Sequence, residues 1–261
     1  MKYGVSVKDT SKVNEIEASG LALLTELNDF ADSLKAIISI EEPPRGIIFH
    51  DLESATKLYS TIPLPAYTSR DLIHITPLVE TWKEIFLASA GGVDEAVEYY
   101  NNLELADVVE IAAHELTHHS DFFHDDFDGD EENMWFEEGL CFYIPRKLIY
   151  SAEKFERIMD VEKKLIDRYK AEYGDYTLDK FGEAGYRGGE NFSYSAAFYD
   201  YWRSTITVKR LVEDYCDGNL QELIKIYTEW TEDDRKQKLI DYFRQKFNMT
   251  HQKAHDLGLA E

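Results

Sequence analysis

The stretch that most constrains this chain is residues 103–119, which combine a helical pattern with a His-Glu-x-x-His motif. At about 100° per residue, the apolar side chains share one stripe of a helix, and His114 and His118 share the opposite face. Two imidazoles one turn apart can bind one zinc ion, and Glu115 can reach a water on that metal. The alternative is an exposed helix face that happens to carry two histidines. The apolar stripe fits both interpretations; it consists of Leu105, Val108, Val109, Ala112 and Leu116.

A third ligand would decide between these interpretations, and residues 134–143 offer two adjacent candidates, Glu137 and Glu138. On a helix, Glu138 shares a stripe with Trp135 and Phe142. A carboxylate on an apolar stripe needs a partner, because burying an unpaired charge is very costly. A zinc ion would supply one, which favours Glu138, with Glu137 as the rival. The alternative is a glutamate that only caps the helix or forms a salt bridge near its start.

The two motifs together resemble those of the gluzincin metallopeptidases, of the peptidase MA-like kind. In that family the glutamate directly before the glycine, on a second helix, completes the zinc site, which implies Glu138 here. The resemblance covers about residues 46–225. It rests on two motifs, His114-Glu115-x-x-His118 and Trp135-x-x-Glu138-Gly139.

The resemblance implies a fold of the α+β class that is mainly helical and zincin-like. A small N-terminal sheet would pack on the motif helix, and a helical subdomain would follow. We therefore expect an N-terminal lobe at residues 1–120 and a helical lobe at residues 121–261 that carries the third ligand. By analogy, an edge strand at residues 62–67 or 72–76 would pair with an extended substrate.

Hydrophobic periodicity independently predicts short strands followed by helices. Three strands precede the motif helix, at residues 46–49, 62–67 and 72–76, and suggest a small mixed or antiparallel sheet. Asn102 is the expected N-cap of the motif helix, and Pro145 should kink a later helix or start a new turn. Further helices are expected at residues 12–38, 54–59, 78–89, 93–101, 131–150, 152–173, 191–202, 206–217, 219–230 and 232–247.

Members of the family often place a tyrosine or histidine on a downstream helix, where it donates a hydrogen bond to the oxyanion. Tyr194 is the first candidate here, since it opens a helix after a glycine-rich loop, and Tyr199 is nearby. A structural tyrosine with its ring in the core is the alternative for both. Arg187, in the glycine-rich loop, could bind a substrate carboxylate or simply be solvated.

The chain also departs from better-known gluzincins. Many carry an aspartate four residues after the glutamate ligand, where it orients a zinc-bound histidine, and this position is Phe142 here. Asp121, Asp125 or a backbone carbonyl would then have to orient His114 or His118. The Gly-x-Met-Glu-Asn segment of one aminopeptidase group is absent, which argues against that group.

Charge and hydropathy limit the classes of partner. The net charge of -23 repels phosphate backbones and anionic lipids, which argues against nucleic-acid and membrane partners. No apolar run approaches the roughly 18 residues needed to span a bilayer, and the N-terminus lacks the features of a secretory signal. Cys141 and Cys216 are far apart and are expected to be buried thiols. These features predict a cytoplasmic protein.

The sequence thus predicts a zinc metallopeptidase that hydrolyses peptide or protein substrates. Its metal ligands would be His114, His118 and Glu138, with Glu115 as general base and Tyr194 as oxyanion donor. A second hypothesis keeps the zinc site without efficient peptidase activity, in an interaction or regulatory module. A third is a helical interaction protein without a metal.

Overall fold

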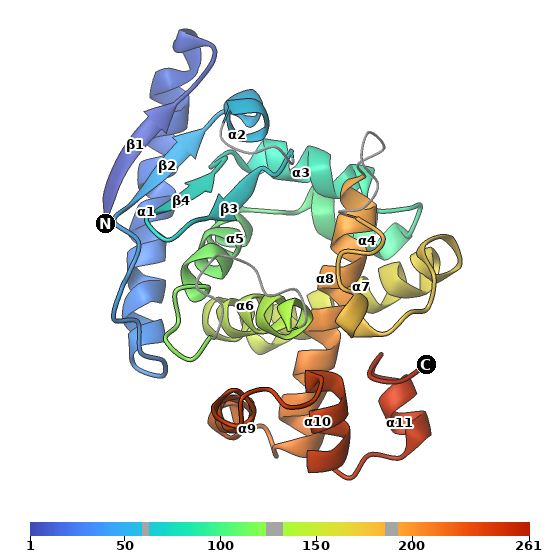
Figure 1. The fold of residues 1–261 in the computed structure, drawn as a ribbon. Helices are drawn as coiled ribbons and strands as arrows, with labels where there is room; N and C mark the ends of the chain where they lie inside the picture. Colours follow the sequence, from blue (N-terminus) through green and yellow to red (C-terminus); the bar gives the residue numbers. More distant parts are fainter. Residues whose placement is uncertain (59–62, 124–132, 186–192) are drawn as a thin grey trace. The chain divides into compact units, whose positions relative to one another are not determined.

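A computed structural model describes residues 1–58, 63–123, 133–185 and 193–261 (Figure 1). These residues form a mainly helical α+β protein with one small sheet, as the hydrophobic pattern predicts. Within these four ranges, no helix is both long and apolar enough to cross a bilayer.

The sheet has four strands in the order β1-β2-β4-β3. β1 (Lys2–Ser6), β2 (Gly46–His50) and β4 (Leu72–Ile75) run parallel, and β3 (Ala66–Thr68) pairs antiparallel with β4. The expected mixed sheet is therefore present, with β1 as an additional strand that the sequence pattern did not reveal. Because β4 pairs on both sides, the expectation that residues 72–76 form an edge strand is wrong; β3 occupies that edge of the described sheet.

Two helices form a layer against this sheet. α1 (Val13–Lys35) contacts β1 and β2, α5 (Leu105–Thr117) contacts β3 and β4, and the two helices also pack on each other. Gly20 makes the approach of α1 possible, because a Cβ atom there would lie 2.2 Å from the Phe49 ring. The motif helix is thus held against both the sheet and α1.

Three short helices lie in the chain before α5: α2 (Leu52–Leu58) follows β2 within the sheet region, and α3 (Val79–Ala88) and α4 (Asp94–Asn101) lie between β4 and α5. The N-cap of α5 is Glu104, so the prediction of Asn102 is wrong. Glu104 and Asp107 form a reciprocal capping box, in which each carboxylate accepts a hydrogen bond from the other residue's backbone N–H. This box satisfies backbone donors that Asn102 would be too far upstream to reach.

The remaining chain is helical. α6 (Met134–Ile149) runs through Pro145 as one helix, and α7 (Ala152–Tyr173) matches the predicted range of 152–173. α8 (Tyr194–Arg210) extends beyond the predicted end at residue 202, and a π-helical turn at residues 211–215 follows it. The chain ends with α9 (Leu220–Glu232), α10 (Leu239–Lys246) and α11 (His251–His255).

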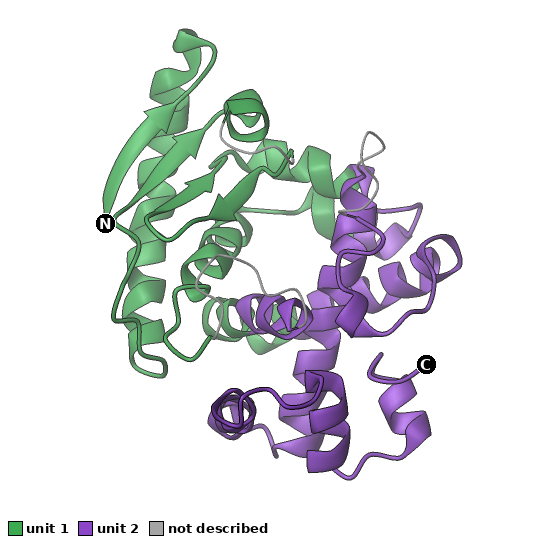
Figure 2. Cartoon of the chain, in the orientation of Figure 1, with its two compact units in different colours: residues 1–87, 98–127, 144–155 green, residues 88–97, 128–143, 156–261 purple. Residues whose placement is uncertain are grey.

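The chain divides into two compact units that interleave along the sequence (Figure 2). Unit 1 contains residues 1–87, 98–127 and 144–155, and unit 2 contains residues 88–97, 128–143 and 156–261. Unit 1 holds the sheet and α5, whereas unit 2 has a buried aromatic core that includes Trp135, Phe136, Tyr227, Trp230 and Phe243. The division into an N-terminal lobe at residues 1–120 and a helical lobe at residues 121–261 stays a prediction.

Candidate metal centre

The motif residues lie on a helix that is buried on nearly every side. Every residue of α5 from Asp107 to Thr117 is buried, including His114 at 5% exposure and Glu115 at 7%. His114 therefore does not lie on an exposed helix face, and His118 is partly buried. A buried carboxylate beside two imidazoles needs a compensating partner, because an isolated buried charge is strongly destabilising.

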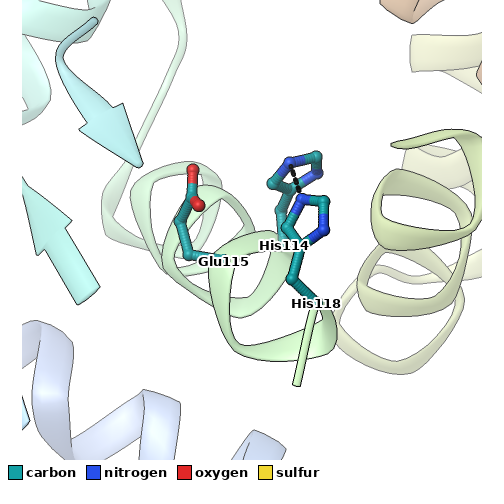
Figure 3. A group of neighbouring side chains, drawn as sticks. All are labelled: His114, Glu115 and His118. Carbon is teal, nitrogen blue, oxygen red and sulfur yellow. Dashed lines mark hydrogen bonds between the residues drawn. The ribbon is translucent and has the colours of Figure 1, made fainter. Parts of the chain in front are cut away.

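The two imidazoles converge at their Nε2 atoms, which lie 3.2 Å apart (Figure 3). Their rings are nearly perpendicular, with an interplanar angle of 79°. Two nitrogen ligands of a tetrahedral zinc ion, each about 2.0–2.1 Å from the metal, would lie about 3.3 Å apart. The separation of these two nitrogens therefore fits joint coordination of one zinc ion.

Glu115 belongs to the same cluster. Its carboxylate and the ring nitrogens of His114 and His118 lie within 4.8 Å of one another, and Figure 3 shows all three side chains on the same side of α5. In the parts of the chain that the structure describes, this is the group of histidine and acidic side chains that could hold a metal ion. A carboxylate at this distance can accept a proton from a water molecule located between it and the imidazoles.

A hydrogen-bond network fixes the start of α5. Asp107 is buried and accepts hydrogen bonds from the hydroxyls of Tyr99 and Tyr150, at 3.3 and 3.0 Å. Its other oxygen accepts from Lys154 Nζ at 3.0 Å and from the Glu104 N–H at 2.9 Å. Asp107 is therefore a structural anchor, which the sequence pattern did not identify because three of these partners are side chains distant from the helix cap.

A buried ion pair fixes the middle of α5. Glu110 Oε1 accepts a hydrogen bond from Arg146 Nε at 2.8 Å, and the two side chains are 5% and 7% exposed. Glu110 is one turn before His114 on the same helix. The pair therefore ties the turn that carries the first histidine to residue 146 of α6, within unit 1.

Two contacts fix the end of α5. His119 is buried, and its Nε2 lies 2.9 Å from Thr68 Oγ1 on the edge strand β3. Burial, together with the neighbouring His118, lowers the pKa of His119 to about 4. Asp121 accepts hydrogen bonds from the Ser39 hydroxyl and the Glu41 N–H. Asp121, which the sequence suggested as a partner of His114 or His118, is thus hydrogen-bonded to the loop after α1.

The two candidate third ligands on α6 differ in their partners within unit 2. Glu137 is buried, and its Oε1 accepts hydrogen bonds from Tyr227 at 2.6 Å and from Asn133 at 2.8 Å. Asn133 also donates to the Tyr227 hydroxyl at 2.7 Å. Glu137 is thereby committed to the interior of unit 2. Glu138, one residue further, projects about 100° away around the helix, and it is not part of the cluster of His114, Glu115 and His118.

The glycine of the second motif has a packing role. A Cβ atom at Gly139 would lie 2.8 Å from the Ser204 carbonyl oxygen and 2.7 Å from a methyl group of Val208, both on α8. Phe142, at the position where many gluzincins carry an aspartate, packs edge-on against Tyr201 with ring centroids 5.5 Å apart. Gly139 and Phe142 therefore both contribute to the packing of α6 against α8.

The two tyrosine candidates also differ. Tyr199 is fully buried, and its hydroxyl donates to the Gly174 carbonyl at 2.7 Å, which indicates a structural role. Tyr194 is the first residue of α8, is only partly buried and stacks on Phe198. Burial raises the pKa of Tyr194 above its ordinary value. Both tyrosines and Glu138 belong to unit 2, whereas the histidines belong to unit 1.

Two further candidates, Asp125 and Arg187, lie outside the described residues. Comparison of the chain with protein-family models, with curated proteins and with solved structures gives no match. The geometry of α5 and the two sequence motifs therefore carry the functional argument.

Proposed function

We propose that this chain is a zinc-dependent metallopeptidase with a zincin-like fold, related in its site to the gluzincins. The observation that carries the proposal is the convergence of two imidazoles, buried His114 and partly buried His118, whose Nε2 atoms are 3.2 Å apart, in one cluster with the buried carboxylate of Glu115. A site of this kind is costly to bury unless a cation compensates it.

His114, His118 and Glu138 would hold the metal, and three protein ligands are typical of catalytic rather than structural zinc. When bound, zinc supplies a coordinated water of near-neutral pKa and polarises the scissile carbonyl of a peptide. The interactions of Glu137 with Tyr227 and Asn133 support the choice of Glu138 as third ligand.

Glu115 would act as the general base. Its carboxylate accepts a proton from the attacking water and returns the proton to the amine that leaves. Glu115 is buried and lies in the same cluster as the two imidazoles, where a metal-bound water would be within its reach. Tyr194, with its pKa raised by burial, would donate a hydrogen bond to the oxyanion.

The edge strand β3 would bind the substrate. It lies at the edge of the sheet, contacts α5, and is linked to the end of the motif region by the contact between Thr68 and His119. An extended peptide can pair with such an edge through main-chain hydrogen bonds. Peptide and protein chains in extended conformation are therefore the proposed substrates.

The test is the Glu115→Gln variant, compared with the wild-type chain and with His118→Ala. We expect Glu115→Gln to retain one zinc ion per chain in elemental analysis, and to lose peptide cleavage by about 10²–10⁴-fold. His118→Ala should lose both the metal and cleavage. Cleavage of a diverse peptide pool, followed by mass spectrometry, should stop on addition of a chelator and return with zinc.

A second candidate function keeps the zinc site without efficient cleavage. Phe142 favours it, because the residue that orients a histidine in many gluzincins is here an aromatic ring packed on Tyr201. Metal-loaded protein that binds stoichiometric zinc but cleaves nothing in the pool would select this candidate. Full cleavage by Glu115→Gln would instead remove Glu115 from the role of base.

A further inference from the structure

A groove on unit 1 lies apart from the histidine cluster, at the other end of α5. It has a volume of about 460 Å³ and is bounded by α1, the first turns of α5 and the last residues of α6. Phe30 and Val109 form its floor and are 4% and 2% exposed. Leu105 and Leu148 line one side, and Leu148 is 39% exposed. A cavity of this size falls within the range of ligand-binding clefts.

The opposite wall is acidic. Glu26 and Asp29 project from α1 into the groove lining and are exposed. Neither side chain forms a salt bridge or a hydrogen bond within the described residues. By contrast Glu104, which also lines the groove, is paired with Lys154 at 3.3 Å. Two uncompensated carboxylates therefore face an apolar floor and wall.

The helix that forms this wall is itself strongly acidic. α1 carries five acidic residues and one basic residue, Lys35. Residues 26, 29, 30 and 33 recur at helical spacing, so that they share one face. From Glu26 to Ser33 the wall is about 10 Å long, which corresponds to two turns of a helix. The groove thus presents apolar and acidic surfaces side by side over a short length.

We propose that this groove binds a short amphipathic helical segment of a cationic partner protein. Apolar side chains at positions i, i+3, i+4 and i+7 of the segment would fill the floor. Its Lys or Arg side chains would pair with Glu26 and Asp29. The charge of the groove and the net charge of -23 both favour a cationic partner over an acidic one.

The experiment uses the full chain and a fluorescent synthetic helix of Leu and Lys with one apolar stripe, measured by anisotropy. Glu26→Lys/Asp29→Lys should weaken binding by about tenfold, because two ion pairs with the helix are lost and repulsion between like charges replaces them. Leu148→Gln should weaken binding by about fivefold, through lost apolar contact.

Matched controls separate the groove from general attraction to an acidic protein. Glu15→Lys/Glu84→Lys makes the same change in net charge at exposed residues away from the groove, and should leave binding within about twofold. Leu21→Gln removes a leucine with 41% exposure from another face of α1, and should have no effect.

Several results would overturn the proposal. If Glu26→Lys/Asp29→Lys and Glu15→Lys/Glu84→Lys weakened binding equally, the interaction would be a non-specific attraction to an acidic protein. A helix with Glu in place of Lys that binds as well as the cationic one would remove the role of Glu26 and Asp29. The absence of binding, or self-association of the chain that Leu148→Gln abolishes in sedimentation, would exclude a cationic partner at this groove.

Discussion

At the scale of single residues, Glu137 and Glu138 are adjacent and carry the same side chain, but their surroundings differ. The hydrogen bonds from Tyr227 and Asn133 account for the burial of Glu137 without any metal. Tyr227→Phe removes one donor from a buried carboxylate and should lower the free energy of unfolding by about 1–3 kcal/mol in urea titration. Its zinc affinity should stay unchanged.

The matched variant Glu138→Gln should give the opposite result. We expect near-normal stability of the metal-free chain and a loss of zinc affinity of at least about 100-fold in competition with a chromogenic chelator. If Tyr227→Phe lost zinc and Glu138→Gln retained it, Glu137 would be the metal ligand and Glu138 the structural carboxylate.

His50 and His74 form a second buried pair on adjacent strands, with His50 Nε2 2.9 Å from His74 Nδ1. Burial, helped by His74, lowers the pKa of His50 to about 4, and burial lowers that of His74. Between about pH 6.5 and pH 4 the unfolded chain therefore binds protons that the folded chain does not. The contribution of His50 to stability should be complete above pH 6.5 and fall on acidification, by up to about 1.4 kcal/mol per pH unit, and the lowered pKa of His74 acts in the same direction.

Urea midpoints measured from pH 7.5 to pH 5 test this prediction. His50→Gln should be less stable at neutral pH but should show a smaller slope with pH. The exposed His251 on α11 provides the control, because His251→Gln should keep the wild-type slope. An unchanged slope in His50→Gln would show that the acid sensitivity has another source.

At the scale of elements, the ion pair between Glu110 and Arg146 holds α5 to residue 146 of α6. Arg146→Met leaves a buried carboxylate without this partner and should cost about 3–5 kcal/mol in urea unfolding. The double variant Glu110→Gln/Arg146→Met should recover much of that loss. The exposed pair of Lys83 and Glu80, at 2.9 Å, is the control, and its disruption should cost less than about 1 kcal/mol.

Gly139 sets the approach of α6 to α8. Alanine normally stabilises a helix relative to glycine by about 1 kcal/mol. At this position the new methyl group would meet the Ser204 carbonyl at 2.8 Å, and a backbone atom cannot turn aside. Gly139→Ala should therefore be destabilising, by about 1–3 kcal/mol in thermal or urea unfolding. A gain in stability would show that the helices separate without cost.

The order of apolar residues along the sequence correctly predicted those helices and strands whose own residues carry a clear helical or strand pattern. α7 was predicted at residues 152–173 because apolar side chains recur along it at helical spacing, and β2 because residues 46–49 are a compact apolar run. β1 was missed because no residue of Lys2–Ser6 is buried, so that the segment lacks an apolar run, and pairing with β2 is what defines it as a strand. The cap of α5 was misassigned because Asn102 is a stronger cap in general than Glu104, whose capping box with Asp107 prevails here.

The same distinction applies to the site. His114 and His118 are four residues apart on one helix, so that the sequence alone predicted their convergence. The partner of Glu137 is Tyr227, 90 residues away, and no local pattern connects them. The anchors of α5 at Asp107, Glu110 and His119 were missed for this reason.

At the scale of the whole molecule, zinc should stabilise the fold if it binds the folded chain alone. A free zinc concentration about 100 times the dissociation constant adds about 2.7 kcal/mol to the free energy of unfolding. Chelation should therefore lower the melting temperature of the wild-type chain and of Glu115→Gln, and leave that of His118→Ala unchanged. An equal effect of the chelator on all three would place the stabilising metal elsewhere.

The burial of α5 has a consequence for any saturation mutagenesis of this gene. All positions from Asp107 to Thr117 are enclosed, whereas α7 alternates between covered and solvent-facing positions. A map of tolerated substitutions would therefore show α5 as one uninterrupted intolerant block, in which positions needed for packing look the same as those of the proposed site. One map would have to score the cellular abundance of each variant and a second map its peptide cleavage. The proposed role of Glu115 would be visible only as a difference between these two maps.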